Sequence, residues 1–353
     1  MPRTVLLTEG KSNPTEAKTA TGLLRYRPAD VVAILDSALV GKTAGEVFGV
    51  GGDIPFVGTL EGVAADALLI GIAPAGGRLP ETWRAIVREA ITRGMDIVNG
   101  LHVFLDEDAE FRELAARHGV RLVDLRRPAR DIRVAEDRVR HIVCHRVHTV
   151  GHDCSVGKML VALEITSALK AAGRWAEFLA TGQTGILIAG KGVPVDHVIS
   201  DFVAGAVEEL VLDNKDCEFA VVEGQGSLVH PLYSGVTLSL LHGCAPQSMV
   251  FVFDPRRNVV RGTGLAMPPL REVIRIYEEI ASFLTPSKVV GLAANTSTLA
   301  PGEAERLIGS TEEALGIPTC DVIRHGSEKL VDALLARDEE LRRERSKRGA
   351  GTT

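Results

Sequence analysis

The sequence predicts an α/β protein of two domains, each built on a mostly parallel sheet. The chain has 353 residues, which suits two domains of ordinary size, and 45% of them are apolar, so both domains can bury a core. Short apolar runs typical of buried strands alternate along the chain with longer runs at helical spacing. This alternation predicts parallel strands with helices on both faces of each sheet.

The composition also excludes several classes of partner. A formal net charge of −6 argues against a nucleic acid or an anionic membrane as the main partner. No apolar run approaches the roughly 20 residues that span a bilayer, and the N-terminus lacks the apolar segment of a signal peptide. The five cysteines include no Cys-x-x-Cys pair, as expected of reduced thiols. We therefore expect a cytoplasmic protein, with no nucleic-acid or membrane partner, that acts on a small molecule.

Residues 1–130 are predicted to form a Rossmann-like domain. An apolar strand at 5–8, a helix at 17–26 and a second strand at 31–36 that ends in an acid make a βαβ start. The first turn, at 9–14, lacks the Gly-x-Gly-x-x-Gly of dinucleotide-binding folds. We therefore expect a Rossmann-like topology without NAD binding.

A Gly-Lys-Thr sequence at 41–43 superficially resembles a nucleotide-binding motif. It has no glycine loop before it and no long apolar-periodic helix after it, so we interpret it as a decoy. A charged, proline-broken run at 126–131 marks the boundary between the domains. The second domain is expected to span 131–340, and 341–353 to form a charged tail.

The second domain is built around a phosphate loop at 148–159. A β-like run leads into a loop with Gly151 and Gly157, the loop ends in Lys158, and a strongly helical run follows. Glycines let successive N–H groups face one point, and the helix N-terminus and the lysine add positive charge there. Strand, glycine loop, Gly-Lys and helix form the context that a phosphate-loop match requires.

The spacing of this loop is unusual, because five residues separate Gly151 from Gly157 and Met159 follows Lys158. The pattern resembles the variant loop of dethiobiotin-synthetase-type P-loop proteins, in which a threonine after the lysine binds Mg²⁺. Methionine has no such oxygen, so we expect phosphate binding without a protein-bound metal. Asn295 ends a late strand, where its amide suits either a nucleobase edge or a turn. The predicted cofactor-binding residues are Gly151, Asp153, Cys154, Ser155, Val156, Gly157, Lys158, Met159 and Asn295.

Several motifs in order carry a resemblance to a known family. They are Ala17-Lys-Thr-Ala-Thr-Gly-Leu-Leu-Arg-Tyr26, Gly41-Lys-Thr-Ala-Gly45, Gly151-His-Asp-Cys-Ser-Val-Gly-Lys-Met159, Ala180-Thr-Gly-Gln-Thr-Gly185, Gly190-Lys-Gly-Val-Pro-Val-Asp196, Ser200-Asp-Phe-Val-Ala-Gly205, Val222-Glu-Gly-Gln-Gly-Ser-Leu-Val-His-Pro231 and Tyr233-Ser-Gly-Val-Thr237. With them the chain resembles the DgcN-type D-glutamate N-acetyltransferases. The resemblance implies transfer of acetyl from acetyl-CoA to the amine of D-glutamate or a related amino acid.

Two other functions fit the same loop. One is an ATP-dependent kinase or ligase of the dethiobiotin-synthetase type, which would use ATP with Mg²⁺ and a small carboxylate substrate. The other is a nucleotide-binding regulatory module without catalysis. The diphosphate and 3′-phosphate of CoA need no metal ligand after Lys158, so Met159 favours the acetyltransferase. We also expect a homo-oligomer, the usual state of metabolic enzymes.

Acetyl transfer needs a base for the ammonium group, donors for the thioester oxyanion and cations for the substrate carboxylates. Glu223 ends an apolar strand beside glycines, in the position of a Walker-B-like acid, although a turn or capping acid has the same pattern. Cys154 offers a rival acyl-thiol route, but we interpret it as a small loop residue because no base partner is visible. The candidate bases are Asp196, Asp201, Glu223 and His230. The candidate substrate-binding residues are Lys18, Arg25, Gln183, Thr184, Lys191, Gln225 and Ser227.

Overall fold

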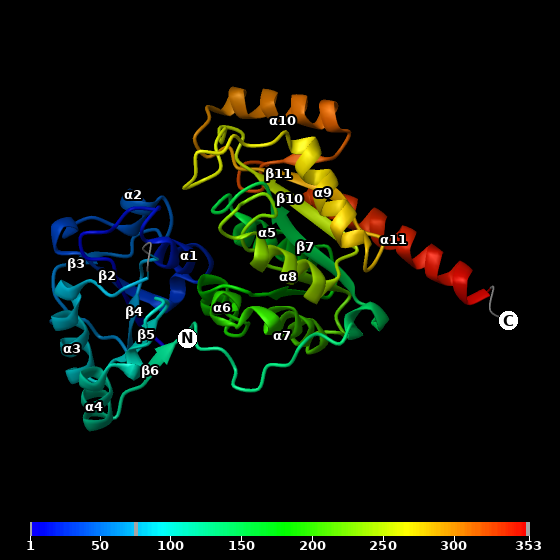
Figure 1. Cartoon of the computed structure of the whole chain (residues 1–353). Helices are drawn as coiled ribbons and strands as arrows, with labels where there is room; N and C mark the ends of the chain where they lie inside the picture. The colour runs from blue at the N-terminus through cyan, green and yellow to red at the C-terminus, as the bar shows by residue number, and fades with distance from the viewer. Residues whose placement is uncertain (1, 74–76, 351–353) are drawn as a thin grey trace. The chain divides into compact units, whose positions relative to one another are not determined.

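The computed structural model describes residues 2–73 and 77–350, which fold into two compact units (Figure 1). Unit 1 comprises Met1–Pro128 and Gly182–His197, and unit 2 comprises Ala129–Thr181 and Val198–Thr353. Each unit is built on a six-stranded sheet whose paired strands run parallel. The predicted α/β class is therefore confirmed.

Unit 1 has the strand order β3-β2-β1-β4-β5-β6. Its strands are β1 (Thr4–Leu7), β2 (Val31–Leu35), β3 (Phe56–Val57), β4 (Ala67–Ile70), β5 (Asp96–Asn99) and β6 (Leu122–Asp124). Its α-helices are α1 (Lys18–Tyr26), α2 (Ala44–Phe48), α3 (Arg84–Thr92), α4 (Ala109–His118) and α6 (Gln183–Ala189). Short 3-10 turns lie at Pro28–Asp30, Ser37–Leu39, Glu81–Trp83, Leu105–Glu107 and Val195–His197.

Both faces of this sheet are covered, and the alternation of side chains along β1 shows how. Val5 and Leu7 join a core cluster with residues of α3 and α4, whereas Leu6 joins a second cluster with α1 and α2. Leu187 of α6 belongs to this second cluster. The segment 182–197 is therefore part of the core of unit 1, although it follows a strand of unit 2 in the sequence.

The Gly-Lys-Thr sequence of unit 1 has a structural role. Thr43 is the N-cap of α2, where its hydroxyl accepts a hydrogen bond from the N–H of Glu46. The carboxylate of Glu46 in turn accepts the N–H of Thr43 at 2.7 Å, which completes a capping box. The threonine thus serves a five-residue helix rather than a phosphate loop.

Unit 2 has the strand order β12-β11-β10-β7-β9-β8. Its strands are β7 (His145–Gly151), β8 (Ala176–Leu179), β9 (Phe219–Val222), β10 (Ser248–Phe253), β11 (Lys288–Ala294) and β12 (Thr319–Cys320). Its helices are α5 (Lys158–Ala171), α7 (Ser200–Leu212), α8 (Ser234–Cys244), α9 (Leu270–Ser282), α10 (Pro301–Leu315) and α11 (Glu328–Ala350), with a 3-10 turn at Arg138–His141. Every residue of β7 is buried, as expected of a central strand.

The chain passes from unit 1 to unit 2 between a short turn and a helix. Val195–His197 is a 3-10 turn in unit 1, and α7 begins at Ser200 in unit 2. The break falls at Ile199, whose φ of −59° and ψ of 136° are not helical. At the C-terminal end, α11 continues to Ala350, and residues 351–353 of the expected tail lie outside the described residues.

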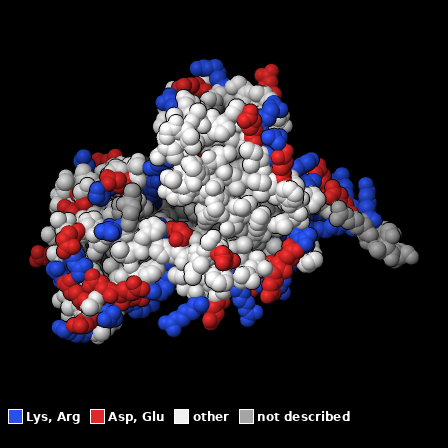
Figure 2. All heavy atoms as spheres, viewed as in Figure 1, with Lys and Arg blue, Asp and Glu red and all other residues white. Residues whose placement is uncertain are grey.

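The faces of the two units that are turned to the viewer in Figure 2 differ in charge. Ion pairs that join Arg84 to Asp108 and to Glu110 link α3 with α4 in unit 1. The part of unit 2 over α8 that faces the viewer is almost free of charged side chains, and Leu238 is 38% exposed on that helix. Within the described ranges, no helix has the length and hydropathy needed to cross a bilayer.

Candidate active site

The loop between β7 and α5 is shaped by two glycines that no other residue could replace without strain. A Cβ on Gly151 would lie 2.4 Å from the carbonyl oxygen of Val252 on the neighbouring strand β10. Gly157, the N-cap of α5, has a φ of 114°, which side chains strongly disfavour. The loop therefore passes directly from the sheet into the N-terminus of a 14-residue helix, where N–H groups and the helix dipole attract anions.

Lys158 lies buried at the centre of this loop. Its Nζ donates a hydrogen bond to the carbonyl oxygen of Asp153 at 2.7 Å, so the amine faces the loop rather than solvent. Burial lowers the pKa of Lys158 to about 8. An anion in the loop would stabilise the charged amine, and the lysine is therefore placed to hold a phosphate group.

Asp153 fastens the loop to a hairpin that follows β10, which we call the arginine hairpin (residues 254–267). The fully buried carboxylate of Asp153 accepts three hydrogen bonds. The donors are the N–H of Cys154 at 2.6 Å, the N–H of Arg261 at 2.9 Å and Nη1 of Arg257 at 3.1 Å. Burial alone would raise the pKa of Asp153, but these hydrogen bonds and the charge of Arg257 hold it below its usual value. Asp153 is thus a structural acid of the loop.

Arg257 and the backbone of Arg261 complete this attachment. Nη1 of Arg257 also donates to the carbonyl oxygen of Cys154 at 2.6 Å. The carbonyl oxygen of Arg261 accepts a hydrogen bond from Nε2 of His230 at 2.9 Å. Sequence reasoning missed both arginines. The Asp-Pro-Arg-Arg run at 254–257 was visible at a strand end, but nothing in the sequence shows that β10 pairs with β7.

His230 lies near the loop but is fully engaged. Nε2 donates to the carbonyl of Arg261, and Nδ1 accepts the N–H of Leu232 at 3.2 Å. Its ring is completely buried. To accept a proton, His230 would have to lose its bond with Leu232, which makes it a poor base in this conformation.

Cys154 is half-buried, and burial raises its pKa above the ordinary value. Its thiol is therefore protonated at neutral pH, which weakens the acyl-thiol route. Ligand atoms of Asp153, Cys154 and His230 lie within 4.8 Å of one another, a spacing that a metal ion could bridge. The hydrogen bonds of Asp153 and His230 already use those atoms, so a metal would have to displace them.

Glu223 follows β9 and lies beside the loop. Its side chain accepts the N–H of Thr181 at 2.9 Å and the amide of Gln225 at 3.2 Å. Its charge also interacts with that of Lys158. Ser227 is completely buried in the segment that follows. The structure thus brings three predicted residues, Glu223, Gln225 and Ser227, into the unit that carries the phosphate loop.

Asn295 contacts the loop through its amide, which donates to the carbonyl oxygen of Val156 at 3.1 Å. His152 is buried, and burial lowers its pKa to about 4. Its Nε2 accepts the N–H of Asp254 at 3.1 Å, so the neutral ring carries its proton on Nδ1, which has no hydrogen-bond partner within the described part of the chain. Met159 is the second residue of α5. Ser155 is exposed in the turn of the loop, with a φ of 55°.

The remaining candidates lie elsewhere in the two units. Asp201 is exposed in the first turn of α7 and forms no ion pair or hydrogen bond with any residue that the structure describes. Asp196, in unit 1, forms an ion pair with Arg126, so its carboxylate is not a free base. The other four predicted substrate residues of unit 1 differ in environment. Thr184 faces Thr19 at 3.3 Å, Gln183 begins α6, Lys18 is half-buried and Lys191 is exposed.

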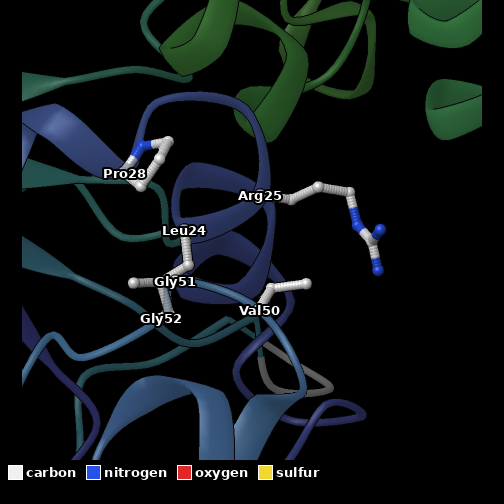
Figure 3. A pocket seen from close by; sticks show the side chains of 6 residues that line it. All are labelled: Leu24, Arg25, Pro28, Val50, Gly51 and Gly52. Atoms are coloured by element: carbon white, nitrogen blue, oxygen red, sulfur yellow. The ribbon is translucent and has the colours of Figure 1, made fainter.

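Arg25 lines an open depression in unit 1 with a volume of about 440 Å³ (Figure 3). The other lining residues are Leu24, Pro28, Val50, Gly51 and Gly52. Figure 3 shows the Arg25 side chain extending away from these residues. The other five lining residues present apolar and backbone atoms, and Arg25, the cation among the lining residues, is turned away from them.

The fold and loop together define a class: a protein with a Rossmann-like unit and a P-loop unit. Residues 133–331 match the family model described as "Domain of unknown function (DUF1611_C) P-loop domain", and residues 37–128 match "Domain of unknown function (DUF1611_N) Rossmann-like domain". The chain belongs to this DUF1611 family. It is 37% identical to a DUF1611 family protein of Anabaena variabilis ATCC 29413, whose crystal structure matches with a TM-score of 0.91 over 95% of this chain and 100% of that one.

Two relatives carry a functional name. A protein of Tritonibacter scottomollicae named D-glutamate N-acetyltransferase is 37% identical over 324 residues, which cover 91% of this chain and 94% of the relative. A protein of Pseudoalteromonas sp. with the same name is 36% identical over 271 residues, covering 76% of this chain and 81% of the relative. The family predicted from the sequence motifs is therefore confirmed.

Proposed function

We propose that this protein transfers the acetyl group of acetyl-CoA to the amino group of D-glutamate or a related amino acid. The observation that carries the proposal is the phosphate loop, in which Lys158 is buried among main-chain groups and Met159 stands where a metal-binding hydroxyl would be needed. Such a loop suits the diphosphate of CoA, which requires cations and N–H donors but no catalytic metal. The names of the two relatives support the same reaction.

In this reaction the neutral amine attacks the thioester carbonyl carbon. A C–N bond forms, the C–S bond breaks, and the CoA thiolate leaves and takes up a proton. The amine must first lose a proton from its ammonium form, and the carbonyl oxygen becomes negative in the tetrahedral intermediate. We assign the oxyanion to the backbone N–H groups of Gly226 and Ser227, in the segment that follows β9, because the amide of Gln225 already donates to Thr181 and Glu223.

We infer that Glu223 takes the proton from the substrate ammonium. Among the four candidate bases, Glu223 is the one that lies beside the loop with its carboxylate held in place. A carboxylate can keep its hydrogen bonds from Thr181 and Gln225 while another of its lone pairs accepts the proton. His230 has both nitrogens engaged and Asp196 is paired with Arg126. Asp201 forms no hydrogen bond or ion pair with a described residue that would orient it.

The reaction is tested by release of free thiol from acetyl-CoA in the presence of D- and L-amino acids. We expect turnover with D-glutamate. The absence of turnover with every acidic amino acid would contradict the proposal. Glu223→Gln should lower kcat by roughly 100-fold or more, as loss of a general base does. Glu218→Gln, at the opposite end of β9 and paired with Arg174, is the matched control and should leave kcat within about twofold.

The cofactor is tested separately by thermal shift. Acetyl-CoA and CoA should raise the melting temperature, because a ligand that binds only the folded state stabilises it. Stabilisation by ATP with Mg²⁺ and none by acetyl-CoA would favour the kinase or ligase instead. Stabilisation by ADP and ATP without any turnover would favour the regulatory module.

A further inference from the structure

We propose that Arg261 binds the 3′-phosphate of the CoA donor and thereby distinguishes CoA from nucleotides that end in a diphosphate. The inference rests on the proposed function and adds a specificity residue that neither the motifs nor the relatives indicate. It is carried by the way in which the arginine hairpin is attached to the phosphate loop.

The backbone of Arg261 is fixed on both sides. Its N–H donates to the buried carboxylate of Asp153 at 2.9 Å, and its carbonyl oxygen accepts Nε2 of His230 at 2.9 Å. The hairpin closes around this residue through the hydrogen bond from the N–H of Val260 to the carbonyl of Leu265 at 2.9 Å. Two buried groups of the candidate site thus hold the main chain at one position, although Arg261 itself is exposed.

The side chain of Arg261 is left available. Arg257 is paired with Asp153 and with Asp254, and Arg256 is paired with Glu303 across 3.4 Å. Arg261 forms no ion pair with any residue in the described ranges, and its charge interacts with Cys154 of the loop. An arginine with a fixed backbone and an unpaired guanidinium beside an anion-binding loop is pre-organised for a second anionic group.

The chemistry of CoA supplies that group. Its diphosphate matches the loop N–H groups and Lys158, whereas the 3′-phosphate on the ribose projects beyond the diphosphate. A phosphate monoester carries roughly one and a half to two negative charges at neutral pH and presents three acceptor oxygens, which a planar guanidinium binds in a bidentate manner. Arg261 lies on the exposed turn of the hairpin, and its main chain is hydrogen-bonded to Asp153 of the loop, so we place the 3′-phosphate beside it.

The test compares CoA with 3′-dephospho-CoA in wild type, Arg261→Ala and Arg256→Ala by titration calorimetry. Wild type should bind CoA roughly 10- to 100-fold more tightly than 3′-dephospho-CoA, as expected for a charge-assisted hydrogen-bonded pair. In Arg261→Ala the ratio of the two Kd values, 3′-dephospho-CoA over CoA, should fall to within about threefold of one. Arg256→Ala, a matched arginine of the same hairpin, should keep the wild-type ratio, because its partner is Glu303.

Each contrary result has a distinct meaning. An unchanged ratio in Arg261→Ala, with equal losses for both ligands, would overturn the assignment and place the side chain on the diphosphate. A selective rise in the KM for D-glutamate, with an unchanged ratio, would overturn it in favour of a substrate carboxylate. If wild type bound neither CoA nor acetyl-CoA, the proposed function itself would fail, and that failure precedes any question about Arg261.

Discussion

The first strand-to-helix loops of the two units show how similar sheets come to differ in what they can bind. In unit 1 the loop after β1 contains a glycine, a lysine and a serine, but its polar groups are used internally. Asp36, after β2, accepts the N–H of Gly10 at 3.1 Å and the hydroxyl of Ser12 at 2.5 Å. Lys11 pairs with Glu16 at 2.6 Å. The hydrogen-bond donors and the lysine charge of this loop are thus paired with two acids of unit 1.

In unit 2 the acids near the loop are arranged differently. Glu223, which follows the strand next to β7, binds Thr181 and Gln225. Asp153 binds the arginine hairpin, and Lys158 rests on a loop carbonyl rather than on a carboxylate at hydrogen-bonding distance. We infer from this difference that a glycine loop is suited to an anion when the acids near it are paired with other groups and its lysine is hydrogen-bonded to a backbone carbonyl oxygen.

The largest effect in this comparison is expected from the acids that hold the two loops, Asp153 and Asp36. Asp153→Asn should lower the free energy of unfolding by roughly 3 kcal/mol, because it weakens a buried carboxylate with three hydrogen bonds and leaves Arg257 partly uncompensated. Asp36→Asn should cost only about 1 kcal/mol, since its partners are neutral donors. Urea denaturation measures both.

The pH dependence gives a check on Asp153. Because its folded pKa is lowered, its stabilisation is present above the pKa of the unfolded carboxyl group and is lost as the pH falls through the lowered value. The difference in the free energy of unfolding between wild type and Asp153→Asn should therefore become smaller in acid. A difference that stays constant to low pH would show that the charge of Asp153 is not what stabilises the loop.

The two loop lysines give the next effect. Lys158→Ala should weaken acetyl-CoA binding by roughly 10- to 150-fold, the loss expected for a charged donor to phosphate. Lys11→Ala in unit 1 and Lys170→Ala, exposed on α5 itself, should each change the Kd less than twofold. An unchanged Kd in Lys158→Ala would remove the distinction between the loops.

The pH dependence of binding sharpens the same comparison. The free protein loses the proton of Lys158 above a pKa of about 8, whereas an anion in the loop requires the charged amine. The Kd for acetyl-CoA should therefore rise by up to tenfold per pH unit above about pH 8. Lys158→Ala should bind weakly with no such slope, and a slope that persisted in this variant would assign it to another group.

The smallest effect concerns the decoy sequence in unit 1. Thr43→Ala should lower the free energy of unfolding by about 1 kcal/mol through loss of the capping box on α2. Its Kd for acetyl-CoA should equal that of wild type. Weaker cofactor binding in this variant would mean that the threonine does more than cap a helix.

The sequence was sufficient for the fold class and for the phosphate loop, because both depend on local patterns. Gly151, Gly157 and Lys158 lie within one continuous segment whose strand and helix are each recognisable from their own residues. Asn295 was singled out because it ends a strand, and the structure shows its amide bonded to the carbonyl oxygen of Val156 in the loop, while its role toward a cofactor stays a prediction. These predictions needed no knowledge of which strands are neighbours.

The arginine hairpin and the position of 182–197 could not be predicted in the same way. Arg257 and Arg261 reach Asp153 only because β10 pairs with β7, and strand order is a tertiary property. Leu187 looks like any apolar residue of a helix, and its place in the core of unit 1 depends on where the chain returns. Asp196 appeared to be a free acid because its partner, Arg126, is 70 residues away in the sequence.

The path of the backbone between the units has a consequence for how this protein can be divided. The chain passes from one unit to the other at three places, after Pro128, Thr181 and His197. A truncation at Pro128 would strip Leu187 and the rest of α6 from the hydrophobic interior of the N-terminal part. Neither half can therefore be exchanged between homologues as a simple block, and a chimaera would need to carry α6 together with the N-terminal half.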